Sequence, residues 1–535
     1  MMEKQLFIES FQYTYPCQCS EGAELFWAQE EKEASYKAFL EKLVKNGFLP
    51  YAQNTVGSNL FATYVKGERI VNVYYTPCDR KVRMVSEARN ALPPRKVDNQ
   101  YVSRVVPLVT QLQLSNLKVD CGMSYVIRLC DGRFVLIDSA YDEYEETERL
   151  LEVLKKQNTV FEKPVIAACI ITHSHSDHLG ALTRLMRDYK NEVVFGDFIY
   201  NWPNPEMTVM SKGTDHQEFD ELVRKMQGAR IIYARSGQRF YYADAVFDVL
   251  FCCDDMYPEF IANYNDSSLI TVMTMNGKKV LWMGDGHARA VACLVDRYDA
   301  NDLKCDILQV THHGYRGGST ELYQKVDPEA LLWPVPDFWY QEVKDWDNNE
   351  YFLRSKQLKH IYISGRGEIT LNMCEELPKV KSEPRYCEGE IIYEEDFEKE
   401  RVIELKWSAL TGGSTGYAGA DLELKSGRCI WKGTETKRTV LEILRPGLLE
   451  NAVVYEMILS GEVIKEAKEF GVIFNHMHPT QWVDEKFVRF DAQMGQYSIR
   501  MTVDEMDQRS GLYFVLKEGI VAFEHVKVIK RGTRT

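Results

Sequence analysis

The sequence of 535 residues lacks the features that mark several classes of protein. No stretch approaches the roughly 18–20 uninterrupted apolar residues of a membrane-spanning helix. The opening residues, MMEKQLFIESFQY, are too polar for a secretory signal. The 13 cysteines are scattered without the spacing of a disulfide framework, which suits a reducing compartment. We therefore expect a cytoplasmic protein without a membrane partner.

Positive charge is also scarce. Lys and Arg number 65 against 79 Asp and Glu, which leaves a formal net charge of −14. An acidic chain has no general attraction for nucleic acid phosphates, so nucleic acid is not an expected partner. Hydrophobic residues at 45% and charged residues at 27% are typical of a globular protein. At this length several domains are expected.

Residues 1–100 have the pattern of a small α+β domain. Apolar residues recur at helical spacing over 21–46, which predicts a helix. Two runs at 59–65 and 70–75 predict strands separated by a short turn. The two prolines within 91–99 indicate a linker. Nothing in this domain indicates catalysis.

From residue 103 to residue 375, strand-like runs alternate with helical patterns. A hairpin is predicted over 125–138, and a helix with an acidic first turn at 143–157. Residues 164–172 are almost wholly apolar, as in a strand buried on both faces, and a helix is predicted at 180–189. Helical crossovers between buried strands predict a layered α/β domain.

Beyond this region, short alternating runs separated by turns predict a β-sandwich over 385–535. The runs at 391–397 and 497–503 resemble those of carbohydrate-binding jelly rolls, so a carbohydrate is a candidate partner of this domain. An exposed Trp431 or Trp482 could stack on a sugar ring, although tryptophan is more often buried in a core.

One segment concentrates histidine in a chain that has little of it. Three of the 11 histidines, His173, His175 and His178, fall within six residues together with Asp177, where the buried strand gives way to a helix. Imidazole nitrogen and carboxylate oxygen are both zinc ligands. Side chains at i and i+2 of an extended stretch point the same way, so His173 and His175 could hold one ion while the turn directs Asp177 and His178 toward a second. The segment predicts a metal site.

His-x-His-x-Asp-His after a buried strand resembles the metallo-β-lactamase superfamily, whose members hold one or two metal ions between the two sheets of an αββα sandwich. Further motifs follow in family order. Asp138 resembles the aspartate that orients a ligand, Asp285 the aspartate that bridges the metals, and His312-His313 the final histidine motif. Asn265 precedes a strand, as in the competence-protein and phosphorylcholine-esterase branches.

The resemblance implies roles for these residues. Neighbouring residues of a strand point to opposite faces, so His312 and His313 are not both expected to face the site. The family favours His313 as the ligand and leaves His312 to contact the substrate. The implied metal ligands are His173, His175, Asp177, His178, Asp285 and His313, with Asp138 behind them; the catalytic candidates are Asp177, Asp285 and His312, and the substrate-binding candidates are Asn265, His287 and Arg316.

A histidine that many family members use as a further metal ligand is missing. Residues 192–202, where it would stand, contain none. Asp197 is a candidate replacement. One or two zinc ions are expected, and manganese, which tolerates oxygen ligands, is the alternative.

These residues predict a hydrolase that uses a metal-bound hydroxide, because metal coordination lowers the pKa of water toward ~7. A small phosphodiester or another phosphorylated molecule is the first candidate substrate, since Arg316 could hold an anion. A lactone, thioester or other ester is an alternative. A non-catalytic glycan-binding or scaffold protein with a degenerate metal site is a third interpretation.

Overall fold

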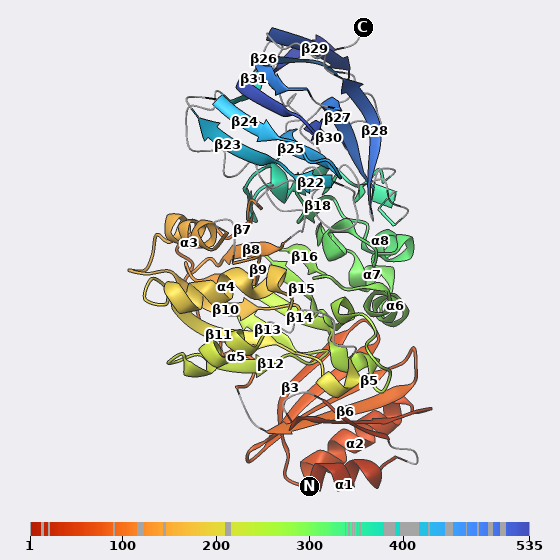
Figure 1. The fold of residues 1–535 in the computed structure, drawn as a ribbon. Helices are drawn as coiled ribbons and strands as arrows, with labels where there is room; N and C mark the ends of the chain where they lie inside the picture. The colour runs from red at the N-terminus through yellow and green to blue at the C-terminus, as the bar shows by residue number, and fades with distance from the viewer. Residues whose placement is uncertain are drawn as a thin grey trace. The chain divides into compact units, whose positions relative to one another are not determined.

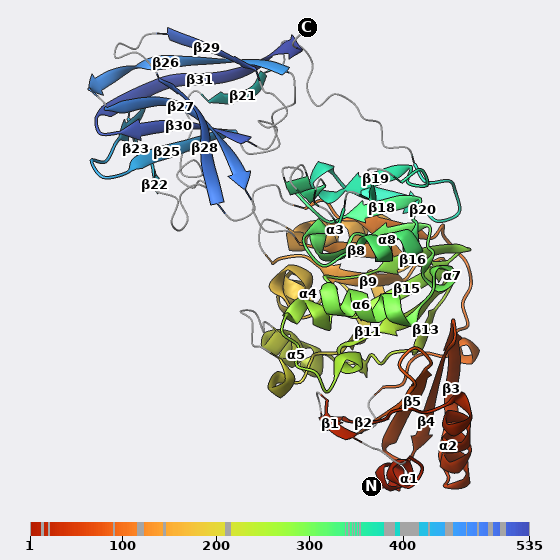
Figure 2. The same ribbon diagram turned by 90° about the vertical axis from the view of Figure 1, so that its right-hand side faces the viewer.

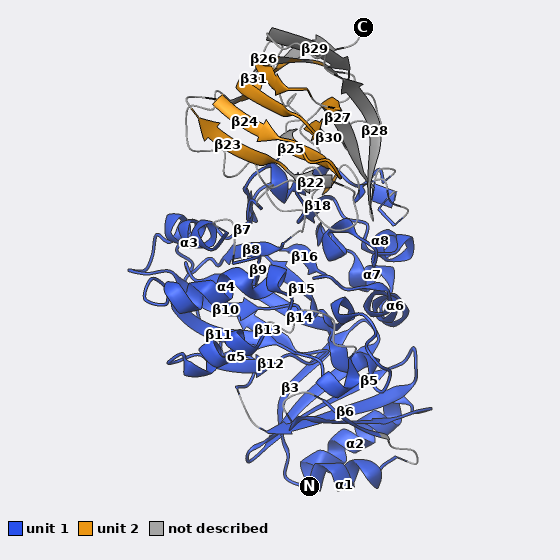
Figure 3. Cartoon of the chain, viewed as in Figure 1, with its two compact units in different colours: residues 1–336, 343–380 blue, residues 337–342, 381–535 orange. Residues whose placement is uncertain are grey.

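The computed structural model forms two compact units: residues 1–336 with 343–380, and residues 337–342 with 381–535 (Figure 3). The N-terminal region, which the sequence patterns separate from residues 103–375, belongs to the same unit as they do. The structure describes residues 2–11, 15–19, 22–88, 91–114, 122–142, 146–208, 216–336, 339–340, 343–344, 346, 348–349, 351–352, 355–378, 391–395, 417–425, 428–444, 453–466, 468–478, 481–489, 496–502 and 510–533.

The first unit begins with a six-stranded antiparallel sheet in the order β1-β2-β6-β5-β4-β3. Helix α2 packs on this sheet (Figure 2), and Phe7, Phe26 and Phe39 belong to the core that it covers. The elements are α1 Met2–Ile8, β1 Tyr15–Gln18, β2 Glu24–Ala28, α2 Glu33–Lys45, β3 Leu49–Val56, β4 Asn59–Lys66, β5 Arg69–Thr76 and β6 Lys81–Ala88.

The two strands expected at 59–65 and 70–75 are confirmed as β4 and β5. The helix expected over 21–46 is wrong in its first part. Residues Glu24–Ala28 form a strand because both of its edges are paired, one with β1 and the other with β6. Sheet pairing thus overrides the helical pattern in this part of the chain.

Two seven-stranded mixed sheets follow, in the orders β12-β11-β10-β9-β8-β7-β20 and β13-β14-β15-β16-β17-β18-β19. Helices α3 to α5 accompany the first sheet and α6 to α8 the second (Figure 1), so the expected αββα sandwich is confirmed. The strands are β7 Leu108–Gln111, β8 Ser124–Arg128, β9 Phe134–Ser139, β10 Val165–Ile170, β11 Val194–Tyr200, β12 Arg230–Tyr233, β13 Arg239–Tyr242, β14 Ala245–Phe251, β15 Ile270–Met275, β16 Lys278–Trp282, β17 Ile307–Gln309, β18 Ala330–Trp333, β19 His360–Ile363 and β20 Ile369–Asn372. The helices are α3 Glu146–Gln157, α4 Ser176–Asp188, α5 His216–Lys225, α6 Ala288–Arg297, α7 Ala300–Leu303 and α8 Thr320–Val326.

Strand β10 is buried on both faces, as its apolar sequence predicts. Ala168 and Ile170 belong to the core between the sheets, whereas Ile166 and Cys169 belong to the core under the helices. Helix α4 begins at Ser176, four residues before the expected start. The last residues of the histidine motif therefore lie in its first turn.

The second unit is a β-sandwich with sheets in the orders β23-β24-β31-β26-β29, where β21 also pairs with β31, and β22-β25-β30-β27-β28. Trp431 is fully buried in its core, so it does not offer a ring to a sugar. The side chain of Trp482 lies outside the described residues. The strands are β21 Ile391–Glu395, β22 Tyr417–Gly419, β23 Asp421–Lys425, β24 Arg428–Lys432, β25 Arg438–Leu444, β26 Val453–Lys465, β27 Glu469–His478, β28 Gln481–Arg489, β29 Gln496–Thr502, β30 Ser510–Lys517 and β31 Ile520–Thr533.

None of the helices in the described part of the chain combines the length and apolarity that crossing a bilayer requires.

A buried ion network joins the N-terminal sheet to the sandwich. Arg235, only 1% exposed, donates from Nη2 to Glu87 Oε2 of β6 at 2.7 Å and from Nη1 to Asp254. Asp254 also accepts from Asn201 Nδ2 at 3.0 Å. Asn201 directly follows β11, so the network reaches the end of the strand that lies beside β10. A buried guanidinium without both carboxylates would be costly, which makes the sheet an integral part of the unit.

Replacing Glu87 with alanine should therefore destabilise the whole unit. The change leaves Arg235 buried beside one carboxylate, and removal of one partner of a buried pair costs about 3–5 kcal/mol in free energy of unfolding. Urea denaturation of the full chain measures the loss. Glu30→Ala, which removes the partner of Arg80 in an exposed pair, is the matched control and should change little. Equal stability of the two variants would contradict the integral role of the sheet.

Candidate metal centre

The histidine motif, one earlier segment and two later segments meet at one end of the two sheets. Residues 171–175 lead from β10 into α4, and Asp138 stands near the end of β9. Asp285 follows β16, and His313 lies in the short 3-10 helix Thr311–Gly314 after β17. Because the carboxyl ends of neighbouring strands lie at the same edge of a sheet, residues far apart in the sequence meet there.

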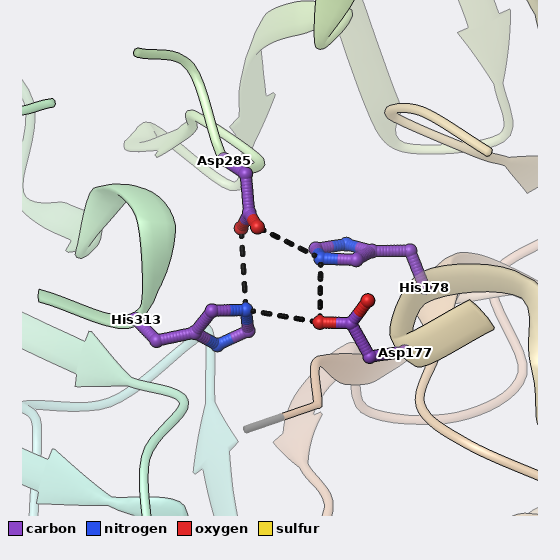
Figure 4. A group of neighbouring side chains, drawn as sticks. All are labelled: Asp177, His178, Asp285 and His313. Carbon is purple, nitrogen blue, oxygen red and sulfur yellow. Dashed lines mark ion pairs between the residues drawn. The ribbon is translucent and has the colours of Figure 1, made fainter. Parts of the chain in front are cut away.

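Four side chains converge there (Figure 4). His178 Nε2 lies 3.3 Å from Asp177 Oδ2 and 3.2 Å from Asp285 Oδ2. His313 Nε2 lies 3.3 Å from Asp177 Oδ2 and 3.3 Å from Asp285 Oδ1. One atom from each of the four side chains lies within 4.8 Å of all the others. Two imidazole nitrogens and two carboxylate oxygens form a donor set that suits zinc.

The burial of these atoms tests whether a cation fits. His178 Nε2, His313 Nε2 and Asp285 Oδ1 are buried and lack a hydrogen bond of proper geometry. A buried polar atom without a partner costs roughly 1–3 kcal/mol. A divalent cation among the four side chains would use the lone pairs of all three atoms. The residues therefore fit a metal ion.

Hydrogen bonds on the far side of each imidazole direct its Nε2 atom inward. Asp138 is fully buried, and its carboxylate accepts from His178 Nδ1 at 2.8 Å. The Thr172 backbone N–H and hydroxyl donate to the same carboxylate, both at 2.8 Å. His313 Nδ1 donates to the Pro334 carbonyl oxygen at 2.8 Å. With Nδ1 donating, the lone pair of Nε2 is available to a metal.

Backbone geometry places the second aspartate. Gly284, just before Asp285, has a φ of +53°, and a Cβ at this position would lie 2.7 Å from Thr172 Cβ. Only glycine permits this conformation and this close approach without strain. The Asp285 backbone N–H donates to Ser268 Oγ at 3.1 Å.

The four side chains hold opposite charges in the absence of a metal. Burial opposes protonation of His313, but Asp285 and Asp177 outweigh it and raise the pKa of His313 to about 9. The same carboxylates raise the pKa of His178 well above its usual value against the effect of burial. Burial likewise opposes ionisation of Asp177 and Asp285, yet the neighbouring histidines lower the pKa of both carboxyl groups. Two ion pairs therefore occupy the place that a cation would take.

Residues 119–331 match the family model described as the metallo-beta-lactamase superfamily. The chain contains a metallo-β-lactamase domain. It is also 25% identical over 169 residues to ComE operon protein 3 of Bacillus subtilis, a match that covers 31% of this chain and 19% of that protein. The chain thus spans about a fifth of the length of this curated relative.

Solved structures resemble the fold at low identity. The metallo-β-lactamase fold protein YhfI from Bacillus subtilis is 10% identical with a TM-score of 0.31, covering 49% of this chain and 99% of that chain. The short form of human tRNase Z is 15% identical with a TM-score of 0.25, covering 42% of this chain and 91% of that chain.

The other two histidines of the metallo-β-lactamase motif do not join the converging group. His173 Nε2 lies 2.9 Å from His175 Nδ1 and 3.9 Å from Asp285 Oδ2. The ring of Tyr264 covers this side, 5.2 Å from the His175 ring, and its hydroxyl is 2.6 Å from Ser174 Oγ. In the described part of the chain, the four-residue group is the only set of metal-ligand type that meets this closely.

Asp197 is not the replacement for the missing histidine. Arg230 donates to its two oxygens at 2.6 and 2.7 Å, and the Tyr242 hydroxyl donates to one of them at 2.6 Å. Both partners lie in strands, so these bonds hold the carboxylate within β11 rather than at the strand end where the histidine motif lies.

The expectation that His312 and His313 face opposite ways is wrong. They do not lie in a strand, and φ values of 47° and 56° put both in the left-handed region. This conformation removes the alternation, and both Nε2 atoms approach Asp285, that of His312 at 3.9 Å. His312 Nδ1 donates to the Arg316 carbonyl oxygen at 2.7 Å, and Asn265 Nδ2 lies 2.9 Å from His312 Nε2.

The remaining candidates surround His312. The His287 ring lies 5.7 Å from the His312 ring. The side chain of Arg316 is exposed, and its carbonyl is the group that contacts His312. Thr172, Ser268 and Tyr264 were not expected near the site from the sequence. Thr172 and Ser268 stand next to the recognised motifs, which is the one signal that could have found them.

Metal binding should release protons at neutral pH. A histidine whose pKa is raised stabilises the metal-free fold fully below its unfolded pKa of about 6.5 and loses this contribution as the pH rises through about 9. Because a metal needs the neutral imidazole, the apparent affinity for zinc should rise with pH up to about 9. Calorimetry of the metal-free protein with zinc chloride, in HEPES and in Tris, measures the protons released. No release at pH 7.5 would contradict the ion pairs described above.

Proposed function

We propose that this protein is a metal-dependent hydrolase of a small phosphodiester or another phosphorylated molecule. The observation that carries the proposal is the group of Asp177, His178, Asp285 and His313, in which the buried atoms His178 Nε2, His313 Nε2 and Asp285 Oδ1 lack a hydrogen bond. Membership of a superfamily of metallohydrolases supports it.

The four residues would hold one divalent cation, for which zinc is the first candidate because the donors are two nitrogens and two oxygens. A bound cation supplies Lewis acidity and activates water as a nucleophile at neutral pH. Asp138 and the Pro334 carbonyl keep His178 and His313 turned inward. His173 and His175 would take a second ion only with further donors from solvent or substrate, and manganese is then the alternative metal.

The substrate would lie on the side of His312, where three groups differ in chemistry. His312 would bind the leaving group, and Asn265 holds its ring in place by donating from Nδ2 to His312 Nε2 at 2.9 Å. Arg316, exposed nearby, would pair with an anionic oxygen of the substrate, and His287 would contact the leaving group. A cationic side chain on the side of His312 would favour a phosphorylated substrate over a neutral ester.

Metal content tests the site directly. Elemental mass spectrometry of the full chain should find one tightly held zinc or manganese ion, lost in Asp177→Ala because a direct ligand is gone. Asp188→Ala, at the exposed end of the same helix, is the matched control and should keep the metal. If the protein is supplied with zinc and manganese and holds neither ion, the proposal is refuted. The interpretation as a non-catalytic glycan-binding or scaffold protein would then be favoured.

Kinetics separate the two roles assigned to the site. With bis(p-nitrophenyl) phosphate as substrate, Asp177→Ala should abolish turnover, whereas Arg316→Ala should mainly raise KM, since it removes an interaction made in the bound ground state. Hydrolysis of p-nitrophenyl acetate but not of the phosphodiester would point to an ester substrate. A large fall in kcat with unchanged KM in Arg316→Ala would contradict its binding role.

A further inference from the structure

A cavity lies within the first unit, and none of its lining residues belongs to the candidate metal centre. Its volume is about 630 Å³, within the usual range of small-molecule sites. Residues at the start of β10, β11 and β12 line it, together with Tyr51, Leu92, Pro94, residues 98–100, Arg133, Tyr241 and Tyr242. The cavity therefore faces the amino ends of the parallel strands, whereas the metal residues stand at their carboxyl ends.

Strand β10 gives the separation of the two sites. Val165 lines the cavity, and His173 begins the metal motif eight residues later. At ~3.3 Å per residue, an extended segment of this length spans roughly 26 Å. A molecule in the cavity would not touch the metal residues.

The charges around the cavity cancel. Arg230 forms a two-point pair with Asp197, at 2.6 and 2.7 Å, and Arg133 Nε donates to Asp131 Oδ2 at 2.8 Å. Asp98, at the rim, is paired in the same way with an arginine of the linker. With every carboxylate matched by a guanidinium, the cavity has no net attraction for an anion or a cation. A neutral ligand fits it best.

The cavity nevertheless presents hydrogen-bond donors. Each guanidinium has five N–H groups, and the aspartates use only some of them. Among the described residues, nothing accepts from Arg230 Nη1 or from the two terminal nitrogens of Arg133. These planar groups have the fixed fork geometry that pairs with two neighbouring oxygens of a ligand.

A backbone irregularity supplies an acceptor. The pairing of β10 with β9 shifts register between Ile166 and Ala168, which leaves Ala167 as the extra residue of a β-bulge. A Cβ on Gly196 of the next strand would lie 2.6 Å from the Ala167 carbonyl oxygen. Both residues line the cavity, so this oxygen occupies the space that a side chain at position 196 would fill.

Aromatic rings complete the lining. Tyr51 and Tyr241 are half-buried and border the cavity, while Tyr242 is buried with its hydroxyl on Asp197. The Tyr51 hydroxyl donates to the Pro93 carbonyl oxygen at 2.6 Å, which holds the ring in place. Fixed aromatic rings supply apolar contact area beside the polar forks at a low cost in conformational entropy.

We infer that this cavity binds a neutral polyhydroxylated molecule, a monosaccharide or cyclic polyol. Vicinal hydroxyls both donate and accept, so they match the guanidinium forks and the Ala167 carbonyl at once, and the C–H faces of the ring pack on the tyrosines. The inference concerns residues that the metal centre does not use and holds whether or not the proposed hydrolysis is correct.

The test is calorimetric titration of the full chain with D-glucose, D-galactose, N-acetyl-D-glucosamine and myo-inositol, with inorganic phosphate as a comparison. At least one of the four neutral molecules should bind saturably, and phosphate should not. Binding of none of the four, or of phosphate alone, would overturn the inference.

Variants then locate the binding. Arg133→Ala and Tyr241→Leu should each weaken it roughly tenfold or more, because each removes a contact worth about 1.4 kcal/mol or more. Tyr241→Phe, which keeps the ring, and Arg187→Ala, which breaks an exposed pair elsewhere, should stay close to the wild-type affinity. Unchanged metal content in all four variants separates this result from a failure of the metal site. Full binding in both Arg133→Ala and Tyr241→Leu would refute the location.

Discussion

The structure of the candidate metal centre depends on one electrostatic constraint: two carboxylates cannot share a buried volume unless positive charge lies between them. Asp177 and Asp285 are brought together from a helix start and a strand end, and in the metal-free protein two raised-pKa histidines balance them. A divalent cation would replace the same two protons. Two protonated histidines without a metal, or one divalent cation, would therefore balance the charge of the same two carboxylates.

Burial makes this balance specific. Asp138, with no exposed surface, binds the Thr172 backbone, the Thr172 hydroxyl and His178 at once, and so ties β9 to the segment after β10 and to the first turn of α4. His178 is thereby oriented by a hydrogen bond on the side away from the site, and His313 is oriented in the same way by the Pro334 carbonyl oxygen. The left-handed backbone at His312 and His313 adds a second nitrogen to the same side of Asp285, which a regular strand would not allow.

The N-terminal sheet is better understood as part of this unit than as an appendage. Arg235 is completed by Glu87 from that sheet and by Asp254 from the sandwich, and Asp254 also holds Asn201 at the end of β11. The sheet and linker also contribute lining residues to the cavity at the opposite end of the strands. One unit thus carries a candidate metal centre at the carboxyl ends and a charge-balanced cavity at the amino ends of the same parallel strands.

Local patterns of the sequence predict a layered α/β domain, the β-sandwich that follows it and the metal-binding motif, because apolar periodicity and the spacing of histidines are local properties. The αββα arrangement followed from the resemblance to the metallo-β-lactamase superfamily. It also located Asp138, Asp285 and His313 by their order along a family pattern. Which of these residues meet depends on tertiary contacts. Four of the six expected ligands converge. His313 Nε2 faces the group because the Pro334 carbonyl oxygen holds Nδ1, and no sequence motif identifies this partner. Asp197 pairs with Arg230 and Tyr242 instead of lying among the metal residues. Residues 24–28 pair with β1 and β6 as a strand instead of starting a helix. Each of these outcomes depends on contacts between segments far apart in the chain, which local patterns do not encode.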